Sequence, residues 1–200
     1  MIEIMKKIIE NVLIALYQPF GFSVIMSVLA MFFYMSVREC GWKAIVLRWL
    51  NDFKTSSRFR KMFVLVFYIA MILFRTLLNR EMWRNPVSNV IGVWGLYNEK
   101  GELTTEAIEN LALFIPFTIL LLWNFREKLL GKRVKLLRII WQSLKVVFLF
   151  SLTIEFLQLF LRLGTFQLSD LFYNTLGGLT GGLIYWIGYR VTQKHPKGDD

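Results

Sequence analysis

The sequence predicts an all-α membrane protein, a bundle of about five transmembrane helices with an added amphipathic helix at the membrane interface. Of the 200 residues, 56% are hydrophobic and only 19% are charged, whereas soluble domains average about 45–50% apolar and about 25% charged residues. The apolar residues gather in runs of roughly 20, the length that a helix needs to cross a hydrocarbon core. No linker or internal repeat interrupts the pattern, so we expect residues 1–200 to form a single polytopic domain.

The predicted spans follow one another along the whole chain. In order they cover residues 11–37, 62–79, 107–125, 139–161 and 171–189. Glu109 lies in the third span, and Lys145 and Glu155 lie in the fourth, which makes these two less distinct by hydropathy. Lys6 and Lys7 precede the first span as in a signal peptide, but its apolar run is too long and no small-residue cleavage site follows. We therefore expect the first span to be retained.

The segment between the first two spans has the pattern of an amphipathic helix. Its large apolar residues recur at intervals of three and four, among basic residues such as Lys43 and Arg48. They are Trp42, Ile45, Val46, Trp49, Leu50 and Phe53. Tryptophan at headgroup level, opposite a charged face, is typical of a helix that lies in the membrane interface. The alternative is a helix packed on the underside of the bundle.

Basic residues distinguish the two ends of the predicted bundle. They are dense between spans one and two, between spans three and four and in the C-terminal tail, and sparse in the other connections. Because positive loops stay in the cytoplasm, we expect a multi-pass protein of the cell membrane with its N-terminus outside and its C-terminus in the cytoplasm. The net charge of +10 is then a signal of orientation, and we expect no nucleic-acid partner.

Cysteine and histidine are almost absent. Cys40 is the single cysteine, and His195, the single histidine, lies in a polar tail. This composition excludes an internal disulfide, a thiolate zinc site, multi-histidine metal chemistry and a Ser-His-Asp triad. We expect no metal and no cofactor.

Polar residues follow one face of each of the last two spans, at ~100° per residue. The face on the fourth span consists of Ser151, Glu155, Gln158 and Arg162. The face on the fifth consists of Asp170, Asn174, Gly177 and Gly181. A charged side chain at the bilayer centre costs roughly 2.5–3.5 kcal/mol on insertion scales. We therefore expect the two faces to meet each other or a wet cavity.

The predicted topology brings further polar residues to the same, outer half of the membrane. Arg75 lies near the outer end of the second span, and Glu109 and Asn110 lie in the outer turn of the third. The candidate polar site then comprises Arg75, Glu109, Asn110, Ser151, Glu155, Gln158, Arg162, Asp170 and Asn174. Glu155 needs a basic partner, a proton or water at its depth. We expect Arg162 near Asp170, and Glu155 deeper, toward Arg75.

Several of these residues have structural explanations as well. Asp170 follows Ser169 at a helix start, where serine caps the helix and the dipole favours an acid. Glu109 lies in the first turn of its helix, where the dipole also favours an acid. The Arg75 side chain is long enough to extend to the outer headgroups. Gln158 and Asn174 suit interhelical hydrogen bonds.

Four glycines in the last span predict close helix packing. They form two small-xxx-small pairs, Gly177 with Gly181 and Gly178 with Gly182. The connection between the last two spans is short, so these spans should be antiparallel neighbours. Since Gly177 and Gly181 share the face of Asp170, we expect them to bring the two polar faces together.

Three motifs occur in order on successive spans. They are Glu109-Asn110-Leu-Ala-Leu-Phe114-Ile-Pro116, Glu155-Phe-Leu-Gln158-Leu and Asp170-Leu-Phe-Tyr-Asn174-Thr-Leu-Gly177-Gly178. In this order the chain resembles the VanZ-like family, named for a bacterial teicoplanin-resistance protein, over roughly residues 75–189. The resemblance implies a multi-pass protein of the bacterial cell envelope that is linked to lowered teicoplanin susceptibility. It implies no particular reaction.

The chain departs from the pattern of the family at three positions. Thr118 stands where the family usually has glycine, and Gln167 and Ser169 stand in a loop that is often richer in aspartate. If those carboxylates bind a cation or a basic ligand in the family, the resemblance implies weak binding or none here.

The residues leave three classes of function open beside a purely structural or assembly role. The leading hypothesis is a non-enzymatic protein whose outer-leaflet polar cavity binds a lipid headgroup, an envelope precursor or an amphiphilic glycopeptide antibiotic, with membrane lipids as further partners. The second is an intramembrane enzyme acting on an envelope lipid, with Glu155 and Asp170 as an acid/base pair. The third is a small transporter. The sequence names neither the ligand nor the oligomeric state.

Overall fold

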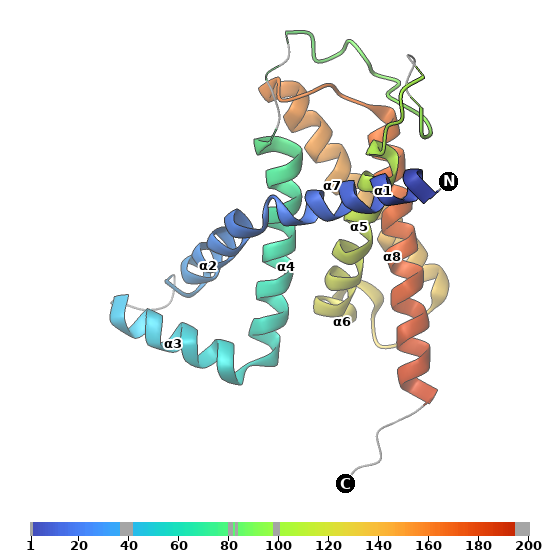
Figure 1. Cartoon of the computed structure of the whole chain (residues 1–200). Helices are drawn as coiled ribbons and strands as arrows, with labels where there is room; N and C mark the ends of the chain where they lie inside the picture. The colour runs from blue at the N-terminus through green and yellow to red at the C-terminus, as the bar shows by residue number, and fades with distance from the viewer. Residues whose placement is uncertain (1, 37–41, 80–81, 83, 98–100, 195–200) are drawn as a thin grey trace.

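The computed structural model describes residues 2–36, 42–79, 82, 84–97 and 101–194. These residues form helices joined by loops, and within them the only β pairing is an isolated bridge between Tyr97 and Leu103. The helices are α1 (Ile2–Tyr17), α2 (Phe20–Ser36), α3 (Trp42–Thr55), α4 (Ser57–Leu73), the π-helix η1 (Phe74–Leu78), α5 (Glu106–Asn124), α6 (Arg126–Leu130), α7 (Leu136–Leu161) and α8 (Leu168–Lys194) (Figure 1). The predicted all-α fold is confirmed.

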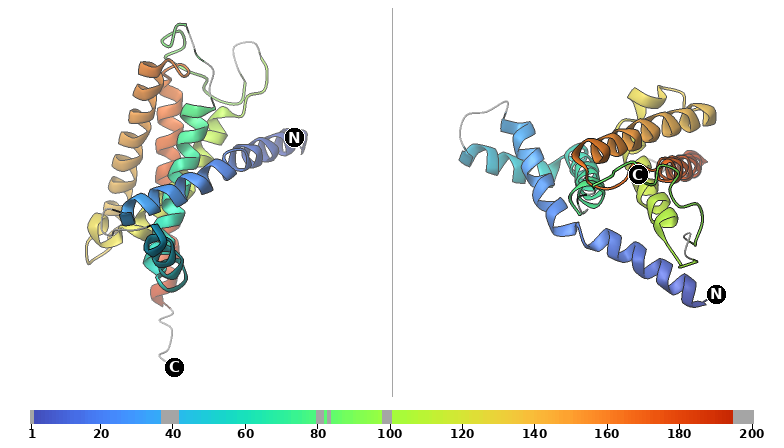
Figure 2. Two further views of the ribbon diagram at one scale, coloured as in Figure 1. Left: turned by 90° about the vertical axis from the view of Figure 1, so that its left-hand side faces the viewer. Right: turned by 90° about the horizontal axis from the view of Figure 1, so that it is seen from above.

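Four helices, α4, α5, α7 and α8, stand side by side and form the bundle (Figures 1 and 2). Its core contains Ile72 from α4, Phe114 and Phe117 from α5 and Val147 from α7. The hydroxyl of Tyr68 on α4 donates to the carbonyl oxygen of Leu113 at 2.9 Å and joins α4 to α5. Inside a bilayer such contacts stabilise the bundle through packing and hydrogen bonding, because lipid tails are as apolar as the side chains they replace.

The N-terminal segment differs from the single predicted span over residues 11–37. It forms two helices, α1 and α2, separated at Gln18 and Pro19. Proline has no N–H and disfavours the helical conformation of the residue before it, so the chain bends there. α1 lies across the bundle instead of along it, and α2 continues obliquely to pack on α4 (Figure 2). An edge-to-face contact between Phe20 and Phe67 joins α2 to α4.

The predicted amphipathic segment is a helix, α3. Ile45 is buried, and Trp49 stacks between Phe32 of α2 and Phe53, at centroid distances of 5.7 and 5.2 Å. This face therefore packs against α2 and the start of α4, as the alternative explanation held. Val46, Leu47 and Leu50 remain exposed on the other side of the helix. Contact of those residues with the interface stays a prediction.

Four segments of the described residues are long and apolar enough to cross a membrane, namely Ile2–Met35, Ser57–Leu78, Glu106–Asn124 and Leu136–Leu161. The last three overlap the second, third and fourth predicted spans. α8 contains the fifth predicted span, 171–189, but does not belong to these four, because its glycines and polar residues dilute its apolar character. Its 27 residues are long enough to cross, at about 1.5 Å per residue. It runs beside α5 and α7 along the bundle (Figure 1).

Candidate functional site

The polar faces of α7 and α8 meet. Asn174 Nδ2 donates to Ser151 Oγ at 2.8 Å, and both residues are buried. Deeper along the pair, a Cβ at Gly178 would lie 2.5 Å from Val147 Cγ2, and a Cβ at Gly182 would collide with the Ser143 hydroxyl. The contacts step by four residues on each helix, which defines a buried seam between them. We call it the α7–α8 seam.

Glu155 lies in this seam near the start of α8. Its side chain is 2% exposed, and its Oε2 accepts a hydrogen bond from the backbone N–H of Gln167 at 2.9 Å. Gln167 immediately precedes α8, whose first N–H groups have no partners inside the helix and carry the positive end of its dipole. Glu155 is therefore stabilised by the end of the neighbouring helix. Asp170, 9% exposed in the first turn of α8, lies on the same side as Asn174, one turn away.

Two polar side-chain atoms of the seam make no hydrogen bond within the described part of the chain. One is Oγ of Ser143, and the other is Oδ1 of Asn174, the other end of the amide that donates to Ser151. Asn174 is 4% exposed. An unsatisfied buried polar group costs about 1–3 kcal/mol, so the Asn174 oxygen is a natural acceptor for a water molecule or for a donor group on a ligand.

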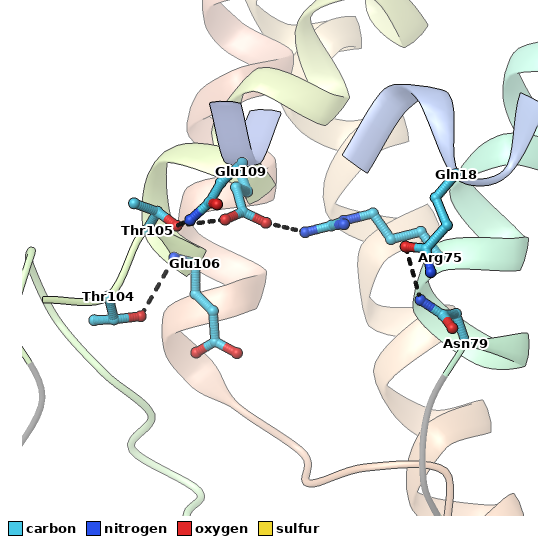
Figure 3. Close-up of polar contacts among 8 residues, drawn as sticks. Gln18, Arg75, Asn79, Thr104, Thr105, Glu106 and Glu109 are labelled. Atoms are coloured by element: carbon cyan, nitrogen blue, oxygen red, sulfur yellow. Dashed lines mark hydrogen bonds and ion pairs between the residues drawn. The ribbon is translucent and has the colours of Figure 1, made fainter. Parts of the chain in front are cut away.

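A second polar cluster joins α1, η1 and α5. Arg75 of η1 forms an ion pair with Glu109 of α5, and the Thr105 hydroxyl donates to the other oxygen of that carboxylate (Figure 3). Asn11 Nδ2 of α1 donates to Thr105 Oγ1 at 2.7 Å. Beside this cluster, Asn79 Nδ2 donates to Gln18 Oε1 at 3.2 Å (Figure 3).

This ion pair corrects the predicted partner of Arg75. The guanidinium meets Glu109 instead of Glu155, because η1, which follows α4 directly and carries Arg75, ends next to the start of α5, and α4 and α5 pack together. Glu109 is correspondingly paired, and only 11% of its side chain is exposed. Asn110 is buried next to it on α5.

Gln158 connects the two clusters. Its Nε2 donates to the carbonyl oxygen of Thr76 at 2.7 Å. Thr76 follows Arg75 in the terminal π turn, where carbonyl groups lack helical partners, and Gln158 lies one turn beyond Glu155 on α7. Ser151, Glu155 and Gln158 thus follow one another at about one turn along α7, and the Gln158 amide reaches η1, the helix that carries Arg75.

Arg162 does not occupy its predicted position. It is the C-cap of α7, with φ of 57°, and its side chain is exposed. Among the described residues it forms no ion pair with Asp170. The left-handed cap turns the chain out of the helix before the side chain can follow the polar face, and the N–H of Leu163 bonds to the carbonyl oxygen of Gln158 at 2.9 Å.

The four glycines divide between two neighbours, which corrects the predicted packing. A Cβ at Gly177 would collide with the backbone oxygen of Leu111, and one at Gly181 with that of Ile115, so these two glycines face α5. Gly178 and Gly182 face α7. The α7 contacts follow a ridge of residues four apart, which drifts around the helix relative to its mean repeat of 3.6. For this reason an ideal helical wheel predicts the wrong pair of glycines at α7.

The sequence did not reveal that residues 86–94 cover the turn between α7 and α8. The N–H groups of Phe166 and Leu168 donate to the carbonyl oxygens of Pro86 and Val90, both at 2.9 Å. Gly92, at φ of 76°, lies so close to Ser169 and Gln167 that any Cβ would collide with them. Trp94 packs on Phe172 and Tyr173 of α8, at 5.2 and 5.9 Å between ring centroids. In the sequence, Gly92 and Trp94 are residues of this loop that could have indicated the contact.

The site has hydrogen-bond donors, acceptors and charge, but little that suggests metal chemistry. Within the described residues no group of three or more His, Cys, Asp or Glu side chains could hold a metal ion. Buried side chains occupy the α7–α8 seam. The polar cavity expected from the sequence stays a prediction.

The sequence is similar to known proteins. Residues 3–189 match the family model described as VanZ/LLP1. The chain is also similar to "Protein VanZ" of Enterococcus faecium, with 30% identity over 107 residues, which are 50% of this chain and 60% of that protein. The matched segment thus spans less than two thirds of the relative. No solved structure shows a significant match.

Proposed function

Because this chain is a membrane protein of the VanZ/LLP1 family, we propose that it binds the polar headgroup of an amphiphilic envelope molecule at the α7–α8 seam. The ligand class comprises envelope lipids, lipid-linked envelope precursors and amphiphilic glycopeptides of the teicoplanin type. Binding involves no covalent step. It lowers susceptibility to teicoplanin-type antibiotics, in line with the family's namesake.

The observation that carries the proposal is the unpaired Oδ1 of Asn174. It lies beside Ser151 in the seam, which a loop covers at one end. The buried acid Glu155 lies one turn from Ser151 on α7, and the buried acid Asp170 lies one turn from Asn174 on α8. Acceptors of this kind suit the hydroxyl and ammonium donors of a headgroup. The exposed Phe156, Phe160 and Phe172 on the outside of α7 and α8 offer an apolar surface for an acyl chain.

Titration calorimetry on the purified full chain tests this proposal. The probes are teicoplanin, a glycopeptide without an acyl chain, and a lipid extract of bacterial envelopes. Asn174→Leu, which keeps the approximate volume and removes the amide, should weaken binding at least tenfold. Thr180→Val is the matched control, because this hydroxyl on the same helix bonds only to its own backbone, at Leu176. Equal binding by Asn174→Leu and the wild type would contradict the proposal.

The enzymatic alternative rests on a different observation, the burial of Glu155 and Asp170 on one seam. Two acids in a poorly hydrated site are the usual arrangement for general acid/base chemistry. This alternative requires a chemically altered lipid after incubation with the protein. Mass spectrometry of the same lipid extract, before and after incubation, separates it from binding alone.

A further inference from the structure

A pocket of about 1070 Å³ opens at the other end of the bundle, far from the α7–α8 turn. The start of α4, the end of α5, the short α6 and the last turns of α8 surround it (Figure 1). Four basic side chains and one acidic side chain line it, namely Arg58, Lys61, Arg126, Lys128 and Glu127. No part of the candidate polar site reaches this pocket.

Aromatic rings hold two of the basic groups at the wall of the pocket. The Lys61 ammonium lies 4.6 Å from the centre of the Trp123 ring, and the Arg126 guanidinium lies 5.8 Å from that of Tyr189. Such contacts are worth about 0.5–1 kcal/mol at exposed sites. Asn124 Nδ2 donates to the backbone oxygen of Lys61 at 3.1 Å and fixes the end of α5 against α4. The cations are thus oriented before any ligand arrives.

The pocket changes from charged to apolar along the helices. Ile119 of α5 and Ile184 of α8 line it one turn farther into the bundle than the aromatic residues Trp123 and Tyr189. A ligand that fits both parts has an anionic head and an apolar tail. Basic pockets between membrane helices, with tryptophan and tyrosine at headgroup level, match a phospholipid of one leaflet.

From this arrangement we propose that the pocket is a binding site for an anionic phospholipid. The phosphate lies among Arg58, Lys61, Arg126 and Lys128, and the first methylenes of an acyl chain contact Ile119 and Ile184. The site is separate from the α7–α8 seam and does not depend on the ligand proposed there. It anchors the end of the bundle that carries the densest basic segments, and an anionic leaflet strengthens that attachment.

The test uses purified full-length protein in detergent, titrated with phosphatidylglycerol and with phosphatidylcholine of the same acyl chains. Binding is followed by native mass spectrometry and by the rise in melting temperature. Arg58→Gln with Lys61→Gln should weaken phosphatidylglycerol binding about 30-fold, since each basic group near an anionic head contributes roughly fivefold. Lys132→Gln with Arg133→Gln is the matched control, because it removes two exposed charges from the neighbouring connection outside the pocket. The control should bind like the wild type.

Three results would overturn the proposal. They are equal binding of the two lipids, equal loss in the two double variants, and full displacement of the lipid by millimolar sodium phosphate. The last would show a site for a free phosphate ion. If Arg58→Gln with Lys61→Gln does not fold, Arg126→Gln with Lys128→Gln tests the opposite wall with the same expected loss.

Discussion

Glu155 shows how a single carboxylate is accommodated inside an apolar helix pair. Its position in a polar stripe was predictable from the sequence, but its partner was not, because any residue supplies a backbone N–H and the sequence does not mark which one points at the acid. The sequence indicates a cationic partner such as Arg75, which the structure instead pairs with Glu109, while Glu155 accepts from the N–H of Gln167. The polar residues of the candidate site were identifiable, whereas their pairings depended on where each helix ends.

At Glu155 two substitutions separate charge from hydrogen bonding. Glu155→Gln keeps an oxygen that accepts from Gln167, so melting temperature should change little, while ligand binding that needs a negative charge should be lost. Glu155→Leu leaves that buried N–H unpaired and should destabilise the protein by about 1–3 kcal/mol. Thermal unfolding and calorimetry on both variants measure the two effects. Full ligand binding by Glu155→Gln would reduce the residue to a cap for α8.

Arg162 offers a test in the stabilising direction. A residue other than glycine in the left-handed region costs roughly 1 kcal/mol or more, so Arg162→Gly should raise the melting temperature. Arg162→Ala retains the strain and should not. Both variants should bind ligand normally, because the side chain is exposed at the end of α7. A matching loss of binding in the two variants would return Arg162 to the functional site.

At the scale of helices, α8 is the element that positions the site, because it packs its glycines against two neighbours at once. The sequence predicted close packing and an antiparallel α7–α8 pair but not the contact of Gly177 and Gly181 with α5. That assignment depends on the crossing of the helices, which residue spacing alone does not determine. The close approach of α8 to α5 at Gly181 also explains why Thr118 is tolerated on α5. The Cβ of Thr118 lies only 3.0 Å from the place of a Cβ at Gly181, so the missing side chain on α8 leaves room for it.

The contact with α5 predicts opposite effects for one substitution at two glycines of α8. Gly181→Ala forces a Cβ into the backbone oxygen of Ile115 and should destabilise the protein by about 1–3 kcal/mol. Gly188→Ala, with nothing within 4 Å, should be neutral or stabilising, since alanine favours helix over glycine. Melting temperatures in the same detergent provide the measurement. Equal tolerance of both changes would mean that α8 does not lie this close to α5.

For the whole molecule, the fold class and the four bundle helices were predictable from long apolar runs, and α3 was predictable from its amphipathic spacing. The course of the N-terminal segment was not. Hydropathy reads residues 11–37 as one run, whereas Pro19 divides it and the first half lies across the bundle. The alternation of basic and neutral connections is a property of the chain as a whole, and it predicts the orientation.

Thiol labelling tests that orientation. In a Cys40→Ala background, a cysteine replacing Ser88 should react with a membrane-impermeant reagent on intact cells, because the covering loop is predicted to lie outside. A cysteine replacing Lys132 should react only after the membrane is opened. Both residues are exposed in the structure. The reverse pattern would move the α7–α8 seam to the cytoplasmic leaflet.

The bond from Gln167 to Glu155 also bears on how the protein enters the membrane. Donor and acceptor are separated by 12 residues along the chain. A nascent chain therefore acquires both as soon as the α7–α8 hairpin has been synthesised. The carboxylate, costly to insert alone, enters the lipid already bonded if the two helices move laterally as a pair. We therefore expect the α7–α8 hairpin to enter the membrane as one unit, with the short turn at residues 162–167 holding donor and acceptor together during insertion.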